Sequence, residues 1–213
     1  MSRAITLDTI RAAAPRVYAT AVRTPLVSSP FLDEKLGGRV LLKCETLQRT
    51  GSFKFRGAYN ALSSLSVAER AKGVIAVSSG NHAQGVAEAA RLLGIAATIV
   101  MPADAPAIKV DNTRAHGAHI VFYDRYSESR EEIADRLARD GGAVVVPSFD
   151  DSDIVAGQGT VGLEILHQLR ELAESPPPAV AVPVGGGGLA SGIALAIAEA
   201  QIIGAEPEGW ADM

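Results

Sequence analysis

The sequence predicts an α/β protein with a parallel sheet covered on both faces, and three observations carry this prediction. Short, continuously apolar runs recur along the chain, which is typical of strands buried on both faces of a sheet. Segments with apolar residues at helical spacing separate these runs. The 213 residues are 47% hydrophobic and 21% charged, an ordinary globular balance. Alternation of the two kinds of segment defines the α/β class.

The expected strands are the apolar runs at residues 40–45, 74–79, 96–102, 118–123, 143–147, 179–185 and 202–206. The helix expected after the second strand has apolar residues at helical spacing and closes on a glycine, in the pattern Ala83, Val86, Ala87, Ala90, Leu93 and Gly94. A helix beginning near Ser127 has acidic residues in its first turn and arginines in its last, which suits the helix dipole. An apolar helix over 189–200 leaves almost no loop before the last strand, so either it ends early or residues are absent there.

Composition and charge favour small-molecule chemistry. The net charge is -4, so no basic stripe is available for a nucleic acid. Cys44 is the only cysteine and forms no internal disulfide, which makes a reducing compartment the natural location. No apolar run approaches the roughly 20 residues that span a bilayer, and residues 1–13 lack a signal-peptide core. We therefore expect a cytoplasmic protein without nucleic-acid or membrane partners.

The stretch 51-GSFKFRGA-58 places an amine, Lys54, between two phenylalanines at an expected helix start. A cation gains nothing there from the backbone dipole, because a helix start is already electropositive. One interpretation is a stem that packs on the aromatic rings while the ammonium group reaches water. The other is a desolvated amine that bonds covalently to an aldehyde. Burial and a cationic neighbour such as Arg56 would lower the pKa of this amine and favour the second interpretation.

A glycine-rich turn, 185-GGGGL-189, lies directly between an expected strand and an expected helix. Successive glycines let backbone N–H groups crowd around a ligand without interference from Cβ atoms. The helix start adds partial positive charge. The turn therefore suits a phosphate group, although a flexible turn is the alternative.

A second turn of this kind is 78-SSGNH-82. Its hydroxyl, amide and backbone N–H groups suit a carboxylate or a ring oxygen, although the same residues also serve as ordinary helix caps. Two anion-binding turns and a lysine together indicate a phosphorylated aldehyde cofactor. In this arrangement the glycine turn holds the phosphate, Lys54 bonds the aldehyde, and Asn81 donates to the ring hydroxyl.

The motifs 51-GSFKFRGA-58, 78-SSGNHAQGVA-87, 156-AGQGT-160, 183-PVGGGGLASG-192 and 204-GAEPEG-209 together resemble the threonine/serine dehydratase and serine racemase family of fold-type II pyridoxal-phosphate (PLP) enzymes, which are tryptophan synthase beta-like. The resemblance implies two open, twisted, mostly parallel α/β domains with the cofactor in the cleft. Residues 1–48 and 146–213 would form an incomplete larger domain, and residues 49–145 a smaller inserted one. The family continues for about another hundred residues, so we expect a C-terminally truncated chain. The partner of the pyridine nitrogen would lie in that missing part.

The resemblance also implies roles by position. Lys54 matches the lysine that holds the cofactor and later moves the Cα proton, Phe53 matches the residue that flanks the ring, and Asn81 matches the partner of the phenolic oxygen. The phosphate loop is matched by Gly185, Gly186, Gly187, Gly188 and Leu189. The turn that receives the substrate carboxylate is matched by Ser78, Ser79, Gly80 and His82. Ser79 is also similar to the acid or base of the opposite face in racemases. Gln158 and Gly159 lie in a stretch that lines the substrate pocket.

Glu206 and Asp212 resemble the carboxylates of a divalent-cation site in part of this family, with the carbonyl of residue 210 as a third ligand. Oxygen ligands suit Mg2+ or another hard divalent cation. Trp210 stands where a small residue is usual. The alternative interpretation is an acidic surface turn.

The implied function is β-elimination on L-threonine or L-serine, giving a 2-oxo acid and ammonia, in a homodimer when the protein is full length. A serine racemase remains an alternative, as does a dehydratase of 3-hydroxyaspartate or of a hydroxyectoine breakdown product. A nucleotide-dependent oxidoreductase is a rival from another class, because Gly186, Gly188 and Glu206 imitate a dinucleotide fingerprint. A non-catalytic fragment or binding module is the third possibility.

Overall fold

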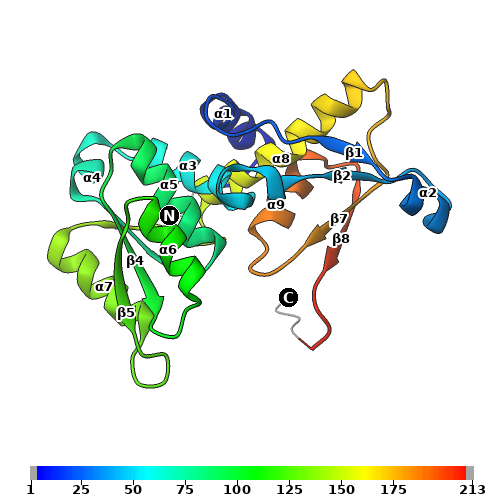
Figure 1. Cartoon of the computed structure of the whole chain (residues 1–213). Helices are drawn as coiled ribbons and strands as arrows, with labels where there is room; N and C mark the ends of the chain where they lie inside the picture. The colour runs from blue at the N-terminus through cyan, green and yellow to red at the C-terminus, as the bar shows by residue number, and fades with distance from the viewer. Residues whose placement is uncertain (1–3, 210–213) are drawn as a thin grey trace.

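The computed structural model of the chain describes residues 4–209, and its elements form two lobes that lie side by side (Figure 1). The first lobe contains a parallel sheet in the order β5-β4-β3-β6. Its strands are β3 (Val74–Val77), β4 (Ala97–Pro102), β5 (His119–Tyr123) and β6 (Val144–Val145). Its helices are α3 (Lys54–Ser64), α4 (Val67–Lys72), α5 (Asn81–Leu93), α6 (Ala107–Ala115) and α7 (Arg130–Gly141).

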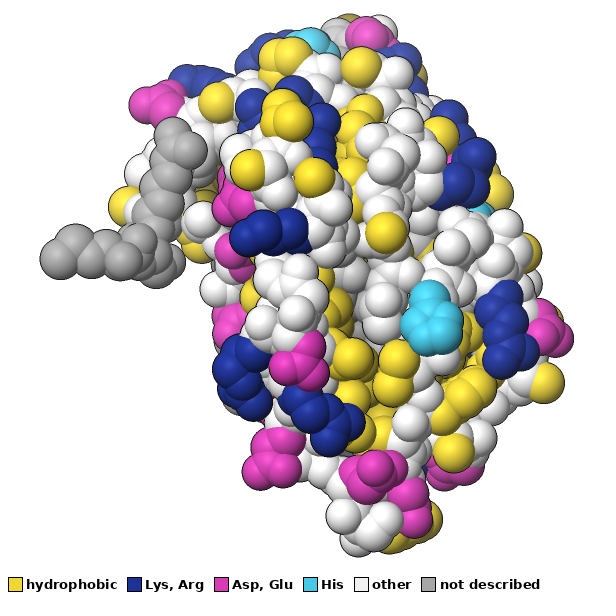
Figure 2. All heavy atoms as spheres, turned by 90° about the vertical axis from the view of Figure 1, so that its left-hand side faces the viewer, with side chains coloured by type: hydrophobic (Ala, Val, Ile, Leu, Met, Phe, Trp, Pro, Cys, Tyr) yellow, Lys and Arg dark blue, Asp and Glu magenta, His cyan; other side chains and the backbone are white. Residues whose placement is uncertain are grey.

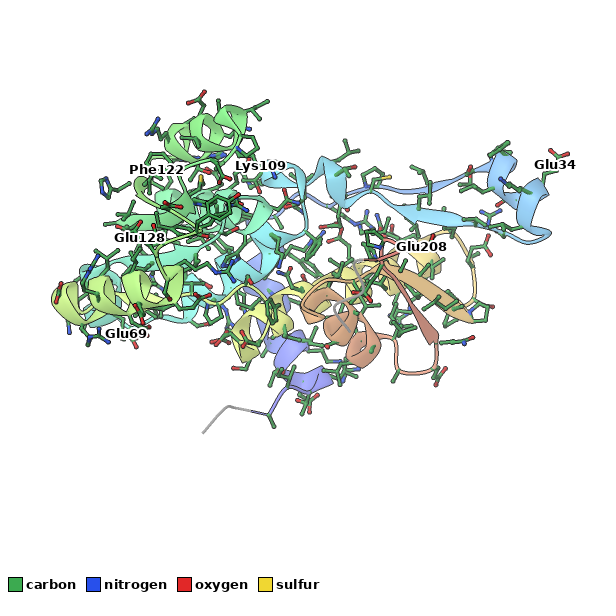
Figure 3. The ribbon with its side chains drawn as sticks, turned by 90° about the horizontal axis from the view of Figure 1, so that it is seen from below. Glu34, Glu69, Lys109, Phe122, Glu128 and Glu208 are labelled. Carbon is green, nitrogen blue, oxygen red and sulfur yellow. The ribbon has the colours of Figure 1, made fainter. Side chains whose placement is uncertain are left out.

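The second lobe contains a parallel pair of strands and a projecting hairpin. The parallel strands are β7 (Ala179–Pro183) and β8 (Gln201–Ala205). The hairpin pairs β1 (Leu26–Ser28) antiparallel with β2 (Leu41–Lys43) and has α2 (Pro30–Leu36) at its tip, where Glu34 points outward (Figure 3). The helices are α1 (Leu7–Tyr18), α8 (Ser152–Glu171) and α9 (Gly188–Ala196), and two short 3₁₀ turns, η1 (Glu45–Leu47) and η2 (Arg49–Gly51), precede α3.

The predicted α/β class is confirmed, with strands at each expected run. The run at 40–45 pairs antiparallel with β1, a strand that the sequence pattern did not indicate. The helix expected from Ser127 begins later, at Arg130, because Ser129 caps it by accepting a hydrogen bond from Glu132 N. The helix expected over 189–200 ends early, at Ala196, so residues 197–200 form a loop of ordinary length before β8.

Two apolar cores meet at α8. Ile154, near the start of this helix, belongs to the core formed with α3, α5 and the sheet. Ala156, Val161 and Ile165 belong to the other core, with α1 and α9. A single helix therefore supplies side chains to both lobes, and it ties their positions together. The domain boundaries expected at residues 48/49 and 145/146 stay a prediction.

The helix α3 lies close against α5 and α8 at points where glycines allow the backbones to approach. A Cβ atom on Gly157 of α8 would lie 2.6 Å from the carbonyl oxygen of Arg56, and one on Gly57 would lie 2.7 Å from the carbonyl oxygen of Ile154. On the other side, a Cβ atom on Gly85 of α5 would lie 3.1 Å from the carbonyl carbon of Lys54. Such close approach of backbones leaves α3 little freedom to shift.

The outer face of the first lobe carries charges of both signs. Figure 2 shows basic and acidic side chains interspersed around apolar ones on this face. Across residues 4–209, no helix combines the length and the apolar character that a membrane crossing needs.

We expect Gly157→Ala to lower the free energy of unfolding by about 2 kcal/mol, because the new Cβ overlaps the backbone of α3. The matched control is Gly141→Ala, in the last turn of α7, where a Cβ would have no neighbour within 4 Å. There the better helix propensity of alanine should maintain or raise stability. Urea unfolding followed by circular dichroism measures both, and equal effects of the two substitutions would contradict the close crossing.

Candidate functional site

Lys54 is the first residue of α3, and its side chain is partly buried. Its Nζ donates a hydrogen bond to the carbonyl oxygen of Ser148 at 2.6 Å. It lies 5.6 Å from the centre of the Phe53 ring, a cation–π distance. Burial lowers the pKa of the amine below its ordinary value of 10.5. These surroundings favour the interpretation of a desolvated amine over the one in which the ammonium group reaches water.

The cause expected for this lowered pKa was partly wrong. Burial is the cause that the structure supports, and Arg56 is not a contributor. The guanidinium of Arg56 is fully buried and forms ion pairs with Glu45 at 2.7 Å and Glu164 at 3.0 Å. Two carboxylates neutralise its charge, so little of it is left to act on the amine of Lys54.

A short stretch of chain links Lys54 to the glycine turn, and we name residues 146–149 the 146–149 strip. Ser148 of this strip accepts the hydrogen bond from Lys54. The next residue, Phe149, packs on the glycine turn, where a Cβ atom on Gly186 would collide with its ring. A Cβ atom on Gly188 would lie 2.8 Å from the carbonyl oxygen of Phe149. The strip thus brings the lysine and the glycine turn together.

The glycine turn leads from β7 into α9 and leaves backbone N–H groups free of side-chain caps. Gly187 occupies the N-cap position with a φ of 78°, in the left-handed region that favours glycine. No side chain in the described part of the chain caps the start of α9. Gly185 has open space where a Cβ would be. Leu189, in contrast, is buried in the core of the second lobe.

The turn at residues 78–82, which we name the serine turn, leads from β3 into α5 in the same way. Ser78 Oγ accepts a hydrogen bond from Gly80 N at 3.2 Å, which closes the turn on itself. Gly80 takes the N-cap position, and within residues 4–209 no side chain caps this helix start either. Asn81 is exposed, whereas His82 is buried. His82 turns its ring toward the 146–149 strip, with Nε2 at 3.1 Å from the carbonyl oxygen of Val146.

Basic residues that the sequence analysis did not single out lie near the serine turn. A hollow of about 90 Å³ is lined by Ser78, Ser79, Tyr123, Arg125 and Arg130, among others. Lys109 of α6, labelled in Figure 3, also lies beside the turn. A Cβ atom on Gly80 would be 3.8 Å from the Nζ atom of Lys109. These cations come from the turn after β5, the start of α7 and the helix α6. Parallel strands end at the same edge of the sheet, which is the feature that could have indicated them.

The remaining site predictions are placed differently. Gln158 is buried on α8 and its Oε1 accepts a hydrogen bond from Gly57 N at 3.3 Å. Gly159 packs against Ile10 and Gly192. Gln158 thus contacts α3 and Gly159 contacts α1 and α9, and the role of both residues in binding a substrate stays a prediction.

The expected cation site is only partly within the described residues. Glu206 follows β8, whereas Trp210 and Asp212 lie outside residues 4–209. Within the described range, no group of three or more His, Cys, Asp or Glu residues is arranged to hold a metal ion. The divalent cation therefore stays a prediction.

The residues present fit a phosphorylated aldehyde cofactor. Among residues 4–209, four buried side-chain atoms lack a hydrogen-bond partner: Thr50 Oγ1, Ser52 Oγ, His82 Nδ1 and Gln158 Nε2. They belong to the predicted motifs or to the residue just before one of them. The glycine turn offers uncapped N–H groups to a phosphate, and an amine whose pKa is lowered by burial suits an aldehyde. A parallel α/β fold with these features defines a class of enzymes that hold a phosphorylated aldehyde on a lysine.

Comparison with known proteins identifies the family. The model of the family described as "Pyridoxal-phosphate dependent enzyme" matches residues 18–213. An L-threo-3-hydroxyaspartate ammonia-lyase from a Pseudomonas species is 52% identical over 96% of this chain and 64% of its own length. An L-threonine ammonia-lyase from Thermotoga maritima is 46% identical over 98% of this chain and 52% of its own length. The structure of maize serine racemase superposes with a TM-score of 0.91, at 42% identity, over 97% of this chain and 63% of that one.

The chain therefore belongs to the pyridoxal-phosphate dependent enzyme family. The resemblance seen in the sequence motifs is confirmed, as is the fold-type II class. Family membership decides against the dinucleotide alternative. The chain spans less than two thirds of the length of these relatives.

Behind Lys54, a buried cluster of charges connects α3 to the second lobe. The side chain of Glu164 on α8 is 5% exposed and pairs with Arg56 at 3.0 Å and with Lys43 at 2.5 Å. Burial by itself would raise the pKa of Glu164, but the hydrogen bonds and positive charges of Arg56 and Lys43 hold it below the ordinary 4.5. Burial in turn lowers the pKa of Lys43.

We expect Glu164→Gln to lower the free energy of unfolding by about 3 kcal/mol near neutral pH, because it leaves two buried cations with too few carboxylates. The control is Glu171→Gln on the same helix, which removes an exposed pair with Arg23 and should leave stability nearly unchanged. Urea titrations measure both variants.

The destabilisation caused by Glu164→Gln should become smaller as the pH falls. The folded protein holds Glu164 at a lowered pKa, so its charge stabilises the fold above the ordinary value of 4.5, and this contribution is lost as the pH falls through the lowered value. The difference between wild type and Glu164→Gln should therefore shrink in acid. A constant difference between pH 7 and pH 3 would contradict the ion-pair explanation.

Proposed function

We propose that this chain carries the lysine and the phosphate loop of a PLP-dependent ammonia-lyase, which eliminates the β-hydroxyl of a hydroxy amino acid and releases a 2-oxo acid and ammonia. The observation that carries the proposal is the position of the Lys54 amine. It is partly buried at the start of α3 and faces the same strip of chain on which the glycine turn packs. The ammonia-lyases among the relatives support the reaction class.

When bound, PLP supplies an electron sink that stabilises negative charge at the substrate Cα. Backbone N–H groups at the start of α9 bind the phosphate, and those at the start of α5 bind the substrate carboxylate. Asn81 donates to the ring oxygen. Burial favours the uncharged amine of Lys54, which takes the proton from Cα before the β-hydroxyl leaves as water.

The choice of substrate depends on the charged groups around the serine turn. L-Threonine and L-serine need a cationic or N–H environment for one carboxylate only. Lys109 places a positive group beside the turn. Arg125 and Arg130 line the hollow, but Asp104 and Glu131 pair with them, each at 2.7 Å. Lys109 favours a substrate with a second carboxylate, such as 3-hydroxyaspartate, and the name of the Pseudomonas relative points the same way.

Serine racemisation is a second candidate, because Ser79 lines the hollow beside the turn and carries a hydroxyl that can exchange a proton. A homodimer as the complete assembly, a cytoplasmic location and a divalent cation at Glu206 belong to the same proposal as expectations. Each follows from the resemblance to the family.

The first experiment tests the lysine. With added PLP, the wild-type chain should show a visible absorption band, and borohydride should fix the cofactor on the peptide that contains Lys54. Lys54→Ala should lose both, whereas Lys35→Ala, which removes an exposed lysine of α2, should keep both. Absorbance and peptide mass analysis measure this. Cofactor fixed equally well in Lys54→Ala would contradict the proposal.

The second experiment tests the substrate class. We expect ammonia release from L-threo-3-hydroxyaspartate to have the highest kcat/KM, and Lys109→Met to lower it about tenfold by removing one charge-assisted contact. The same substitution should change kcat/KM for L-threonine by less than about twofold. Lys35→Met serves as the control, and D-serine is assayed alongside. Equal losses for both substrates would contradict a role of Lys109 in selecting a second carboxylate.

A further inference from the structure

His82 has a side chain whose protonation state follows from its surroundings. It is the second residue of α5 and is 3% exposed. Its Nε2 lies 3.1 Å from the carbonyl oxygen of Val146. A carbonyl oxygen only accepts, so Nε2 carries the hydrogen and Nδ1 is left as a bare acceptor. That acceptor is buried and has no partner among the described residues.

The hydrogen bond from His82 acts on the first residue of the 146–149 strip. Val146 also donates its N–H to the carbonyl oxygen of Ile75 in β3, at 2.8 Å. The end of the strip is thus held by the sheet through one backbone group and by the imidazole through the other. Past Val146, the strip leaves the sheet, since β6 ends at Val145.

The other end of the strip makes the contacts that assemble the site. Ser148 accepts the hydrogen bond of the Lys54 amine at 2.6 Å. Phe149 supports Gly186 with its ring and Gly188 with its carbonyl. Only Pro147, which has one backbone dihedral fixed by its ring, separates Val146 from Ser148. A displacement of Val146 is therefore passed on to both contacts.

We propose that His82 is a positioning residue, whose neutral imidazole holds the 146–149 strip where Ser148 meets the amine of Lys54 and Phe149 meets the glycine turn. Burial lowers the pKa of the imidazole to about 4, against a raising effect of its bond to Val146, and the nearby charge of Lys54 lowers it further. The ring is therefore neutral near pH 7. This role differs from binding the substrate carboxylate, which the backbone of the serine turn remains free to do.

Two amide substitutions separate the hydrogen bond from the bulk of the ring. In His82→Gln, the amide nitrogen reaches about where Nε2 lies and keeps a donor for Val146. In His82→Asn, the side chain is one methylene shorter and does not reach. Both are measured in the chain without cofactor or substrate. Amide hydrogen exchange is followed in the peptide 146–151, and the pH dependence of acetylation by acetic anhydride is followed at Lys54 by peptide mass analysis.

We expect His82→Asn to exchange about tenfold faster in this peptide, the equivalent of one lost hydrogen bond. The apparent pKa of Lys54 should rise by roughly one unit, because water reaches the amine when the strip loosens. His82→Gln should stay close to wild type in both measurements. The control is Thr113→Val, which removes the hydrogen bond of another buried side chain, from Thr113 Oγ1 to Lys109 O at 2.8 Å in α6.

The proposal is overturned if His82→Asn leaves both measurements unchanged, if His82→Gln behaves like His82→Asn, or if Thr113→Val gives the same local changes. Nitrogen-15 NMR of the wild-type ring tests it without any substitution, and a charged ring or an Nδ1–H tautomer at pH 7 would also overturn it. The inference rests on the proposed function only in taking Lys54 as the cofactor lysine. Failure of Lys54 to capture PLP, with these results intact, would count against the proposed function alone.

Discussion

The buried guanidinium of Arg56 is the interaction on which the arrangement of the site depends. A cation with no exposure is tolerated only where carboxylates surround it, and its partners come from separate parts of the chain: Glu45 precedes α3, and Glu164 lies on α8. A displacement of α3 would separate these charges inside the protein. Because Lys54 lies two residues before Arg56 on the same helix, the ion pairs also determine where the amine is held.

Close packing complements this electrostatic constraint. The ion pairs set the direction of α3, and the glycine contacts set how near its neighbours lie. Gly57 and Gly157 allow α3 and α8 to touch backbone to backbone, and Gly85 allows α5 to reach the carbonyl group of Lys54. Larger side chains would move the lysine relative to the glycine turn, whose own position depends on α9 and α8 packing together through Gly159 and Gly192.

Two nitrogen bases of the candidate site lie in surroundings that disfavour their charged forms. Burial lowers the pKa of both Lys54 and His82, and both groups hydrogen-bond to carbonyl oxygens of the 146–149 strip. The groups proposed to bind anions, in contrast, are backbone N–H groups at helix starts, which need no ionisable side chain. In the proposed function, the base that moves a proton is therefore distinct from the dipoles that bind the phosphate and the carboxylate.

The sequence by itself determined the α/β class, most of the strands and the family, and it singled out Lys54 as the candidate lysine, because periodicity and short motifs depend on residues close together in the chain. The tertiary structure decided the antiparallel pairing of β1 with β2, the neutralisation of Arg56, the placement of the basic residues around the serine turn, and the contacts of the 146–149 strip. Lys54 and Ser148 are 94 residues apart, and Arg56 and Glu164 are 108 apart. No local pattern encodes such contacts, since they form only when packing brings distant segments together.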